Sequence, residues 1–474
     1  MLIRLSKSCA FALLLLGLAP GRASAQAPAP AAARPAEPPN VVAVPERADD
    51  AAATSELRRA FAAQAAALAR LEAREAERTA HEREPKLSAV RLTGFLQVDW
   101  VAYQQASQDE VDFATGTPLN QNRFTLRRGH LRLDAGQRAL SAALEVDANT
   151  IHGAELRPID AEVSFRWPER DEPRCPRLTV SAGLMKIPFG REVPEADFVR
   201  PFLERSTALR ALFPGSYDLG ARIQAAYRFA VLTVAVMNGH PIGDRVFPAL
   251  APARHKELLG RLGVTSLLLP KVGLKVGVSA DVGTGFHEGT PTTKDALVWR
   301  DDNGDGVVQA TEVQVIAGSA ATPSQTFQRF AVGADGELSV RWAPHGELVV
   351  SAEIVTGQNL DRGLEPADPV ARGRDLREIG WYVGATQELC SWAALGVRYD
   401  EYDPDGDARE QQAAQIVPRD RSYRTLALLA LLRYEEGRLS FEYDRNGNAL
   451  GRQANGAPTT LANDAFTVRA QVTF

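Results

Sequence analysis

Residues 464–474, at the end of the chain, alternate between apolar and polar side chains. Successive side chains of an extended strand point to opposite faces, so this stretch predicts a strand with one apolar and one polar face. The apolar face carries Phe466, Val468, Ala470, Val472 and Phe474. Two kinds of strand fit this pattern. One is the edge strand of a soluble sandwich, and the other is a barrel strand that faces lipid on its apolar side.

The same alternation recurs from residue 89 to the end of the chain and predicts about 16 strands. After a first strand near residues 89–100, the predicted strands are 122–134, 139–150, 157–167, 177–188, 217–229, 231–239, 256–268, 271–283, 326–342, 347–356, 375–389, 392–402, 419–434, 437–446 and 462–474. The connections between them are expected to alternate between short turns and long loops. This sorting is typical of an up-and-down outer-membrane barrel, and a soluble sandwich has no reason to adopt it. We therefore predict an all-β transmembrane fold, an antiparallel barrel of about 16 strands over residues 89–474.

The polar face of each strand is expected to line a water-filled lumen. In the strand 271–283 the inward side chains include Lys271 and Lys275, and in the strand 217–229 they include Arg222. Both signs of charge occur among the inward residues, so the lumen is expected to be polar and mixed. The strand 122–134 does not alternate cleanly at Arg127-Arg128-Gly129, and we expect a β-bulge there.

The N-terminus predicts export. Arg4 and Lys7 precede an apolar run over residues 10–18, and Ala23-Ser24-Ala25 follows it, so residues 1–25 are expected to be a secretory signal peptide. Residues 26–54, rich in Ala and Pro, predict a semi-extended linker. Residues 55–84 predict a short helix that ends at Pro85, and their brief heptad seam leaves a solvated single helix and a small coiled coil both open.

Net charge and cysteine content restrict the classes of protein to which the chain can belong. Removal of Arg4, Lys7 and Arg22 changes the formal net charge from −5 to −8, which argues against a nucleic-acid partner. Cys175 and Cys390 remain after removal of the signal peptide. Two cysteines do not make a disulfide framework, although the two could pair.

A block in the middle of the chain resembles the phosphate-selective porin family, often called porins O and P. It runs from Gly183-Leu-Met-Lys-Ile-Pro-Phe-Gly190 through Phe202-Leu-Glu-Arg-Ser206 and Pro214-Gly-Ser-Tyr-Asp-Leu-Gly220 to Met237-Asn-Gly239. The resemblance implies a homotrimeric diffusion channel of 16 strands in the bacterial outer membrane, with the N-terminal segment in the periplasm. It also implies that the third long loop, residues 191–216, folds into the lumen and forms the constriction.

Four arginines of this loop are the candidate residues for selecting anions such as phosphate, because guanidinium groups bind phosphate through charge-assisted hydrogen bonds. They are Arg191, Arg200, Arg205 and Arg210. Glu204 is the acidic candidate in the same loop. The alternative is that Glu204 and Arg205 brace the loop against the barrel wall.

Residues 301–312, inside the long surface loop 284–325, match the calcium-loop pattern D-x-[DN]-x-[DN]-G-x5-E. The predicted Ca²⁺ ligands are Asp301, Asn303, Asp305, the Val307 carbonyl and Glu312. Gly306 would make the sharp turn that such loops need. The alternative is a polar turn rich in Asp and Asn.

No H-E-x-x-H or G-x-S-x-G motif occurs in the sequence, and the chain is not expected to be an enzyme. The first hypothesis is a passive porin in outer-membrane lipid for small anionic or neutral hydrophilic solutes. The second is a structural or adhesive barrel that uses the calcium loop for surface contacts. The third is a barrel enzyme with a rim cluster at Asp147, His152 and Glu155, for which the sequence offers least support.

Overall fold

The computed structural model describes residues 90–105, 107–111, 118–137, 139–151, 153–168, 177–244, 256–269, 271–342, 346–412, 414–452 and 458–474. The chain divides into two units, residues 1–85 and 86–474, and all described residues belong to the second. The predicted signal peptide, linker and helix lie outside the described residues. Within the described residues, no helix has the length and apolar character needed to cross a membrane.

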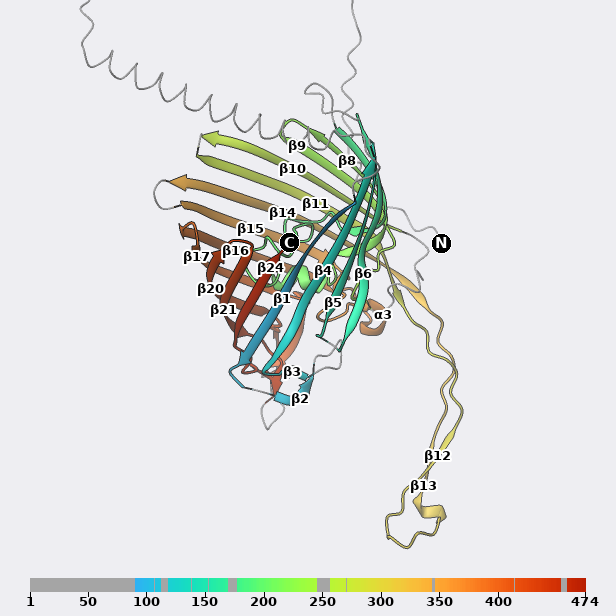
Figure 1. Cartoon of the computed structure of the whole chain (residues 1–474). Helices are drawn as coiled ribbons and strands as arrows, with labels where there is room; N and C mark the ends of the chain where they lie inside the picture. Colours follow the sequence, from blue (N-terminus) through green and yellow to red (C-terminus); the bar gives the residue numbers. More distant parts are fainter. Residues whose placement is uncertain are drawn as a thin grey trace, which may run out of the picture. The chain divides into compact units, whose positions relative to one another are not determined.

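Sixteen antiparallel strands close into a barrel, which confirms the predicted fold (Figure 1). In ring order from β1 they are β1 (Arg91–Tyr103), β24 (Ala465–Thr473), β21 (Gly437–Gly447), β20 (Tyr423–Tyr434), β17 (Ala393–Asp403), β16 (Arg377–Cys390), β15 (Gly346–Gln358), β14 (Gln325–Trp342), β11 (Val272–His287), β10 (Glu257–Leu269), β9 (Ala230–Met237), β8 (Tyr217–Tyr227), β7 (Arg177–Lys186), β6 (Glu155–Trp167), β5 (Leu140–Asn149) and β4 (Arg123–Gln137).

The period-two pattern sorts side chains between the two faces of the wall. On β11, Val278 is 56% exposed on the outer face, whereas Asp281, three residues further along the strand, is fully buried on the inner face. Between β1 and β4 the register shifts, because Leu126 pairs with Val98 while Arg128 pairs with Gln97. Arg127 is therefore the extra residue of a β-bulge, at the position where the sequence predicted one.

The two ends of the barrel differ. One end, here called the turn end, holds short connections such as residues 228–229 and 435–436. The other, here called the loop end, holds longer segments that include the labelled elements β2, β3, β12, β13 and α3 (Figure 1). The predicted alternation has one exception. At the loop end only residues 150–154 join β5 to β6, whereas residues 168–176 join β6 to β7 at the turn end.

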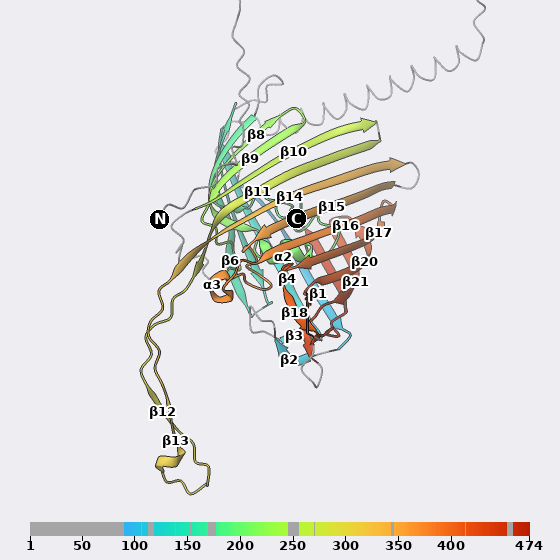
Figure 2. The ribbon, with the colours of Figure 1, turned by 180° about the vertical axis from the view of Figure 1, so that it is seen from behind.

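Several loops contain elements that the sequence pattern did not predict. Four are small two-stranded sheets, which pair β2 (Ser107–Val111) with β3 (Pro118–Asn120), β12 (Ala296–Trp299) with β13 (Val313–Ile316), β18 (Arg409–Gln412) with β19 (Gln415–Pro418), and β22 (Gly451–Arg452) with β23 (Pro458–Thr459). Among the described residues, the helical turns are α2 (Thr207–Leu212), η1 (Ala310–Glu312) and α3 (Pro369–Arg372). The β12–β13 hairpin extends from the loop end, well beyond the barrel strands (Figures 1 and 2).

Candidate functional site

The segment between β7 and β8, residues 187–216, folds into the barrel, and we call it the inward loop. Its backbone donates hydrogen bonds to wall side chains on several strands. The Gly190 amide donates to Ser279 Oγ on β11 at 3.0 Å, and the Leu203 amide donates to Glu442 Oε2 on β21 at 3.0 Å. The Thr207 amide reaches Asp400 on β17, which stands halfway around the ring from β7. The inward loop therefore crosses the lumen to the opposite wall.

An apolar cluster holds the inward loop in place. Phe189 and Phe213 pack with their ring centroids 4.8 Å apart, and the α2 residues Leu209 and Leu212 are buried beside them. Figure 2 shows α2 within the ring of strands. The wall makes room for the helix, because a side chain at Gly380 would come within 2.3 Å of the Ala208 Cβ.

A second loop, residues 359–376, closes over the C-terminus of α2. The amides of Arg362 and Gly363 both donate to the Ala211 carbonyl, at 3.0 and 2.9 Å. The Arg362 guanidinium also contacts the Glu257 carboxylate on β10. The two amides satisfy a carbonyl that the end of a helix leaves free, and the contact with Glu257 ties the second loop to the wall.

Glu204 lies at the centre of an ionic group on the inward loop. Its carboxylate accepts hydrogen bonds from Arg127 Nε at 2.8 Å, Arg128 Nη2 at 2.9 Å and Arg469 Nη2 at 2.8 Å. Burial alone would raise the pKa of Glu204, but the three guanidinium groups outweigh it and hold that pKa well below its usual range.

Two further carboxylates complete this group. Asp99 binds Arg469 at 2.7 Å, and Asp197 lies 3.7 Å from Arg128. We call the six residues, Arg127, Arg128, Arg469, Asp99, Asp197 and Glu204, the Glu204 cluster. It joins the inward loop to β1, β4 and β24, because each of its wall residues lies on one of these strands.

The four predicted arginines of the inward loop have different surroundings. Arg191 pairs with Glu337 at 2.7 Å, and Arg200 pairs with Asp197 at 2.9 Å. Arg205 donates to the backbone carbonyls of Leu209, Phe213 and Pro214, so it stabilises the end of α2. Burial and the neighbouring Arg200 lower the pKa of Arg205 to about 10.

Arg210 is the exposed arginine of the predicted four. Its hydrogen bond goes to Thr207 Oγ1, one turn earlier in α2, at 3.3 Å. Among the described residues, no carboxylate forms an ion pair with Arg210 within 4 Å, whereas Arg191 and Arg200 have such pairs. Arg210 is therefore the predicted residue best placed to meet a solute.

The remaining predicted lumen residues lie apart from one another. Lys275 donates to Glu337 Oε1 at 2.8 Å and keeps 62% of its side chain exposed, next to Arg191. Arg222 donates to Glu162 at 3.0 Å on the β6 side of the barrel. Lys271 is exposed at the β10–β11 turn. Of these three, Lys275 is the one that shares a carboxylate with the inward loop.

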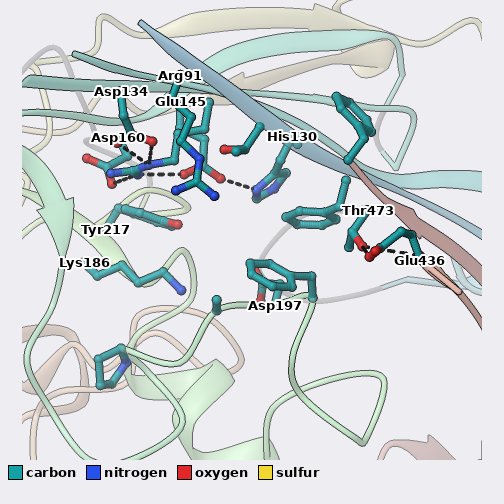
Figure 3. Close-up of a pocket in the computed structure, with 18 residues that line it drawn as sticks. Arg91, His130, Asp134, Glu145, Asp160, Lys186, Asp197, Tyr217, Glu436 and Thr473 are labelled. Carbon is teal, nitrogen blue, oxygen red and sulfur yellow. Dashed lines mark hydrogen bonds and ion pairs between the residues drawn. The ribbon is translucent and has the colours of Figure 1, made fainter. Parts of the chain in front are cut away.

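A cavity of about 750 Å³ opens between the inward loop and the wall formed by β1, β4, β5, β6 and β24 (Figure 3). We call it the turn-end cavity, because Phe474 and Glu436, beside the short turns, line it. Its basic residues are Arg91, His130, Arg132 and Lys186, its acidic residues are Asp134, Glu145, Asp160, Asp197 and Glu436, and its aromatic residues are Phe95, Phe198, Tyr217 and Phe474. It is an amphipathic chamber on one side of the loop.

No protein-family model and no curated protein sequence matches the chain. Among solved structures, it is similar to the outer membrane channel DcaP of Acinetobacter baumannii, with a TM-score of 0.50 and 12% identity over 82% of this chain and 99% of that one. It is also similar to trimeric OmpT of Vibrio cholerae, with a TM-score of 0.45 and 10% identity over 82% and 100% of the two chains. Pseudomonas putida OprB gives a TM-score of 0.45 and 10% identity over 81% and 94%.

The likeness to DcaP shows the fold: this chain has the sixteen-stranded barrel of outer-membrane channels. The finer resemblance to phosphate-selective porins stays a prediction, because no family model matches the sequence.

The predicted calcium loop has part of the expected geometry. The Asp301 carboxylate accepts from the amides of Gly304 and Gly306, and Gly306 has a φ of +70°, as the sharp turn of such a loop requires. Glu312, by contrast, accepts from Trp299 Nε1 at 3.2 Å. Among the described residues, no group of three His, Cys, Asp or Glu side chains is arranged to hold a metal ion.

Other predictions concern single residues. Asp147 lies 3.4 Å from the His130 ring, while His152, its predicted neighbour in a rim cluster, lies outside the described residues. Cys390 is free and half-buried, and Cys175 lies outside the described residues, so their pairing stays a prediction.

The sequence did not single out the residues that fix the inward loop from a distance. Arg362 and Lys186 are examples. Arg362 lies in a loop, outside any predicted strand, and the pattern around Lys186 carries no sign of its contact with the Glu195 carbonyl. For Arg127 and Arg128 the sequence did carry a signal. The two adjacent arginines break the alternation of the strand, which indicates a bulge that turns both of them inward.

Proposed function

We propose that the protein is an outer-membrane porin, a water-filled channel for passive diffusion of small hydrophilic solutes. The observation that carries the proposal is a closed ring of sixteen strands with a loop tied across its interior. A barrel of this width encloses more space than wall side chains fill, and an inward loop narrows it. The likeness of its fold to the channel DcaP supports the same function.

The proposed location is the bacterial outer membrane, with the turn end toward the periplasm and the N-terminal segment on that side. The exposed apolar side chains on the outer faces of the strands support contact with lipid. We further propose a homotrimer, following the family resemblance.

The proposed solutes are small and anionic or neutral, with phosphate as one candidate. Arg210 supports anion preference, because it is exposed on the inward loop. Arg191, Arg200 and Arg205 support it less, since each guanidinium group already pairs with carboxylates or donates to backbone carbonyls.

Single-channel recording of the refolded protein in planar bilayers tests the proposal. We expect stable ohmic conductance, with a reversal potential in a salt gradient that reports the sign of the preferred ion. A barrel that inserts and resists heat unfolding but carries no current above the bare bilayer would refute the channel.

We also propose that the loop 301–312 binds Ca²⁺ through Asp301, Asn303, Asp305, the Val307 carbonyl and Glu312. The sequence match and the left-handed Gly306 support this site. Binding requires the Glu312 carboxylate to leave Trp299 and turn toward the other ligands. An adhesive role for this projecting hairpin is the second candidate function, and the exposed Leu297, Val315 and Ile316 of β12 and β13 favour it.

A further inference from the structure

The inward loop crosses the lumen within a few residues of β7. This strand ends at Lys186, and the amide of Glu192 already lies against Glu353 on β15, the sixth strand from β7 around the ring. Six residues of extended chain span at most about 20 Å, so this stretch has little slack. The chain then turns over residues 190–194. The direction that the rest of the inward loop takes is therefore decided at this turn.

Glu353 holds the backbone of the turn. Its Oε2 accepts from the amide of Arg191 at 3.2 Å and from the amide of Glu192 at 3.4 Å. Gly190, directly before them, has a φ of +62°, and its own amide donates to Ser279 Oγ. Successive backbone N–H groups beside a residue in the left-handed region form a concavity for an anion, called a nest. In this nest the anion is a side chain of the protein itself.

The other oxygen of Glu353 explains why residue 190 is a glycine. Glu353 is 4% exposed, and its Oε1 has no hydrogen-bond partner among the described residues. A Cβ built at Gly190 would overlap this oxygen, and the left-handed φ also disfavours a residue with a Cβ. A buried oxygen without a partner destabilises a fold, so its presence points to a role other than stability.

The neighbouring strands shape the wall around the same turn. Tyr382 on β16 lies opposite Glu353 in the register, and its hydroxyl is 3.5 Å from Arg191 Nη1. Phe189 packs over Gly333 on β14, where a Cβ would come within 3.1 Å of the ring. The wall therefore fits the turn on both sides of Glu353, which supplies the acceptor for its amides.

We propose that Glu353 is a positioning residue of the pore. By filling the nest, its carboxylate fixes the direction in which residues 193–206 continue through the lumen, and so sets the width of the remaining opening. Contacts further along the loop, such as that of Glu442 with the Leu203 amide, then hold a segment whose direction is already set. The statement about pore width rests on the proposed channel, whereas the statement about loop position does not.

Distances between two spin labels on the full refolded chain test the position of the loop without requiring conduction. One label is placed at Val199→Cys, which is 53% exposed on the inward loop, and the other at Lys271→Cys, exposed at the β10–β11 turn. The background carries Cys175→Ser and Cys390→Ser. We expect Glu353→Ala to shift or broaden the distance distribution. Glu353→Gln should leave it unchanged, because the oxygen of the Gln amide accepts the same two hydrogen bonds.

Gly190→Ala tests the nest from the backbone side, because its methyl group would meet Glu353 and disfavour the left-handed φ. It should displace the labels as Glu353→Ala does. The double variant should add little, since both changes act through one contact. Glu347→Ala is the control, because Glu347 lies on the same strand and pairs with the exposed Arg341, away from the inward loop. In planar bilayers, the displaced variants should show a higher conductance and more open-channel noise than the parent protein.

Unchanged distances in both Glu353→Ala and Gly190→Ala, or equal displacement in Glu353→Gln and Glu353→Ala, would overturn the proposal. Gly190→Ala keeps the test valid if Glu353→Ala does not fold. Displaced labels with the parent conductance would overturn the effect on pore width. A parent protein that never conducts, but whose labels move in both variants, refutes the channel alone. Steady parent conductance with unmoved labels in both variants refutes the role of Glu353 alone.

Discussion

Replacement of Glu204 by Gln should make the channel more anion-selective. The change keeps the size of the side chain and removes one negative charge from the Glu204 cluster, which holds three arginines and three carboxylates. The cluster then carries a net positive charge of one. An ion that passes within about 4 Å of one unit charge changes its energy by about 1 kcal/mol in a water-like medium, which is about fivefold in local concentration.

The assay is the reversal potential of single channels in a tenfold KCl gradient at low ionic strength. We expect Glu204→Gln to shift it toward the chloride equilibrium potential, and the shift should shrink near 1 M salt, where the Debye length is about 3 Å. Glu347→Gln is the matched control, because Glu347 pairs with a single exposed arginine at the turn end. An unchanged reversal potential at low salt, or an equal shift in the control, would show that the Glu204 cluster does not border the conducting path.

Three further predictions follow from other parts of the molecule. Arg210→Gln should lower anion preference in the same recordings, by up to about fivefold in permeability ratio, because it removes an exposed charge; unchanged permeability would exclude Arg210 from the path. A cysteine introduced at Asp305 should react with an impermeant thiol reagent on intact cells and one at Gly346 should not, and the reverse pattern would invert the topology. Millimolar Ca²⁺ should protect the loop 284–325 from protease, with a Kd on the order of 10⁻⁴ to 10⁻³ M, and Asp301→Ala with Glu312→Ala should abolish this protection; equal protection of the double variant would contradict the calcium site.

The strands were predictable because a barrel wall imposes period two on almost every residue. For example, the pattern predicted a strand over residues 217–229, and β8 runs from Tyr217 to Tyr227. The bulge at Arg127 was equally visible, because an extra residue breaks the alternation locally. Such features depend on neighbours in the sequence and on which face meets lipid.

The sequence pattern did not predict the hairpin β12–β13, because alternation arises only where one face of a strand is buried. Ala296–Trp299 is exposed at all four positions, so no face is buried and no alternation results.

The roles of the loop arginines could not be predicted from the sequence. Arg191 is neutralised by Glu337, and Glu204 is bound by Arg469, which lies 265 residues away in the chain. Any of several inward carboxylates could have been the partner of Arg191, and any of several inward arginines the partner of Glu204. The pairing is decided by how far the inward loop reaches across the lumen, and α2 with its apolar packing sets that reach.

The inward loop also has a mechanical consequence. A ring of sixteen strands without a packed interior resists stretching along its hydrogen bonds but can be flattened, because neighbouring strands hinge easily about one another. The loop connects β7 to β17 and β21 through the contacts of Thr207 and Leu203, and so acts as a crossbeam between facing walls. The cross-section of the pore is thereby fixed, so the open channel should carry a steady current with little low-frequency noise.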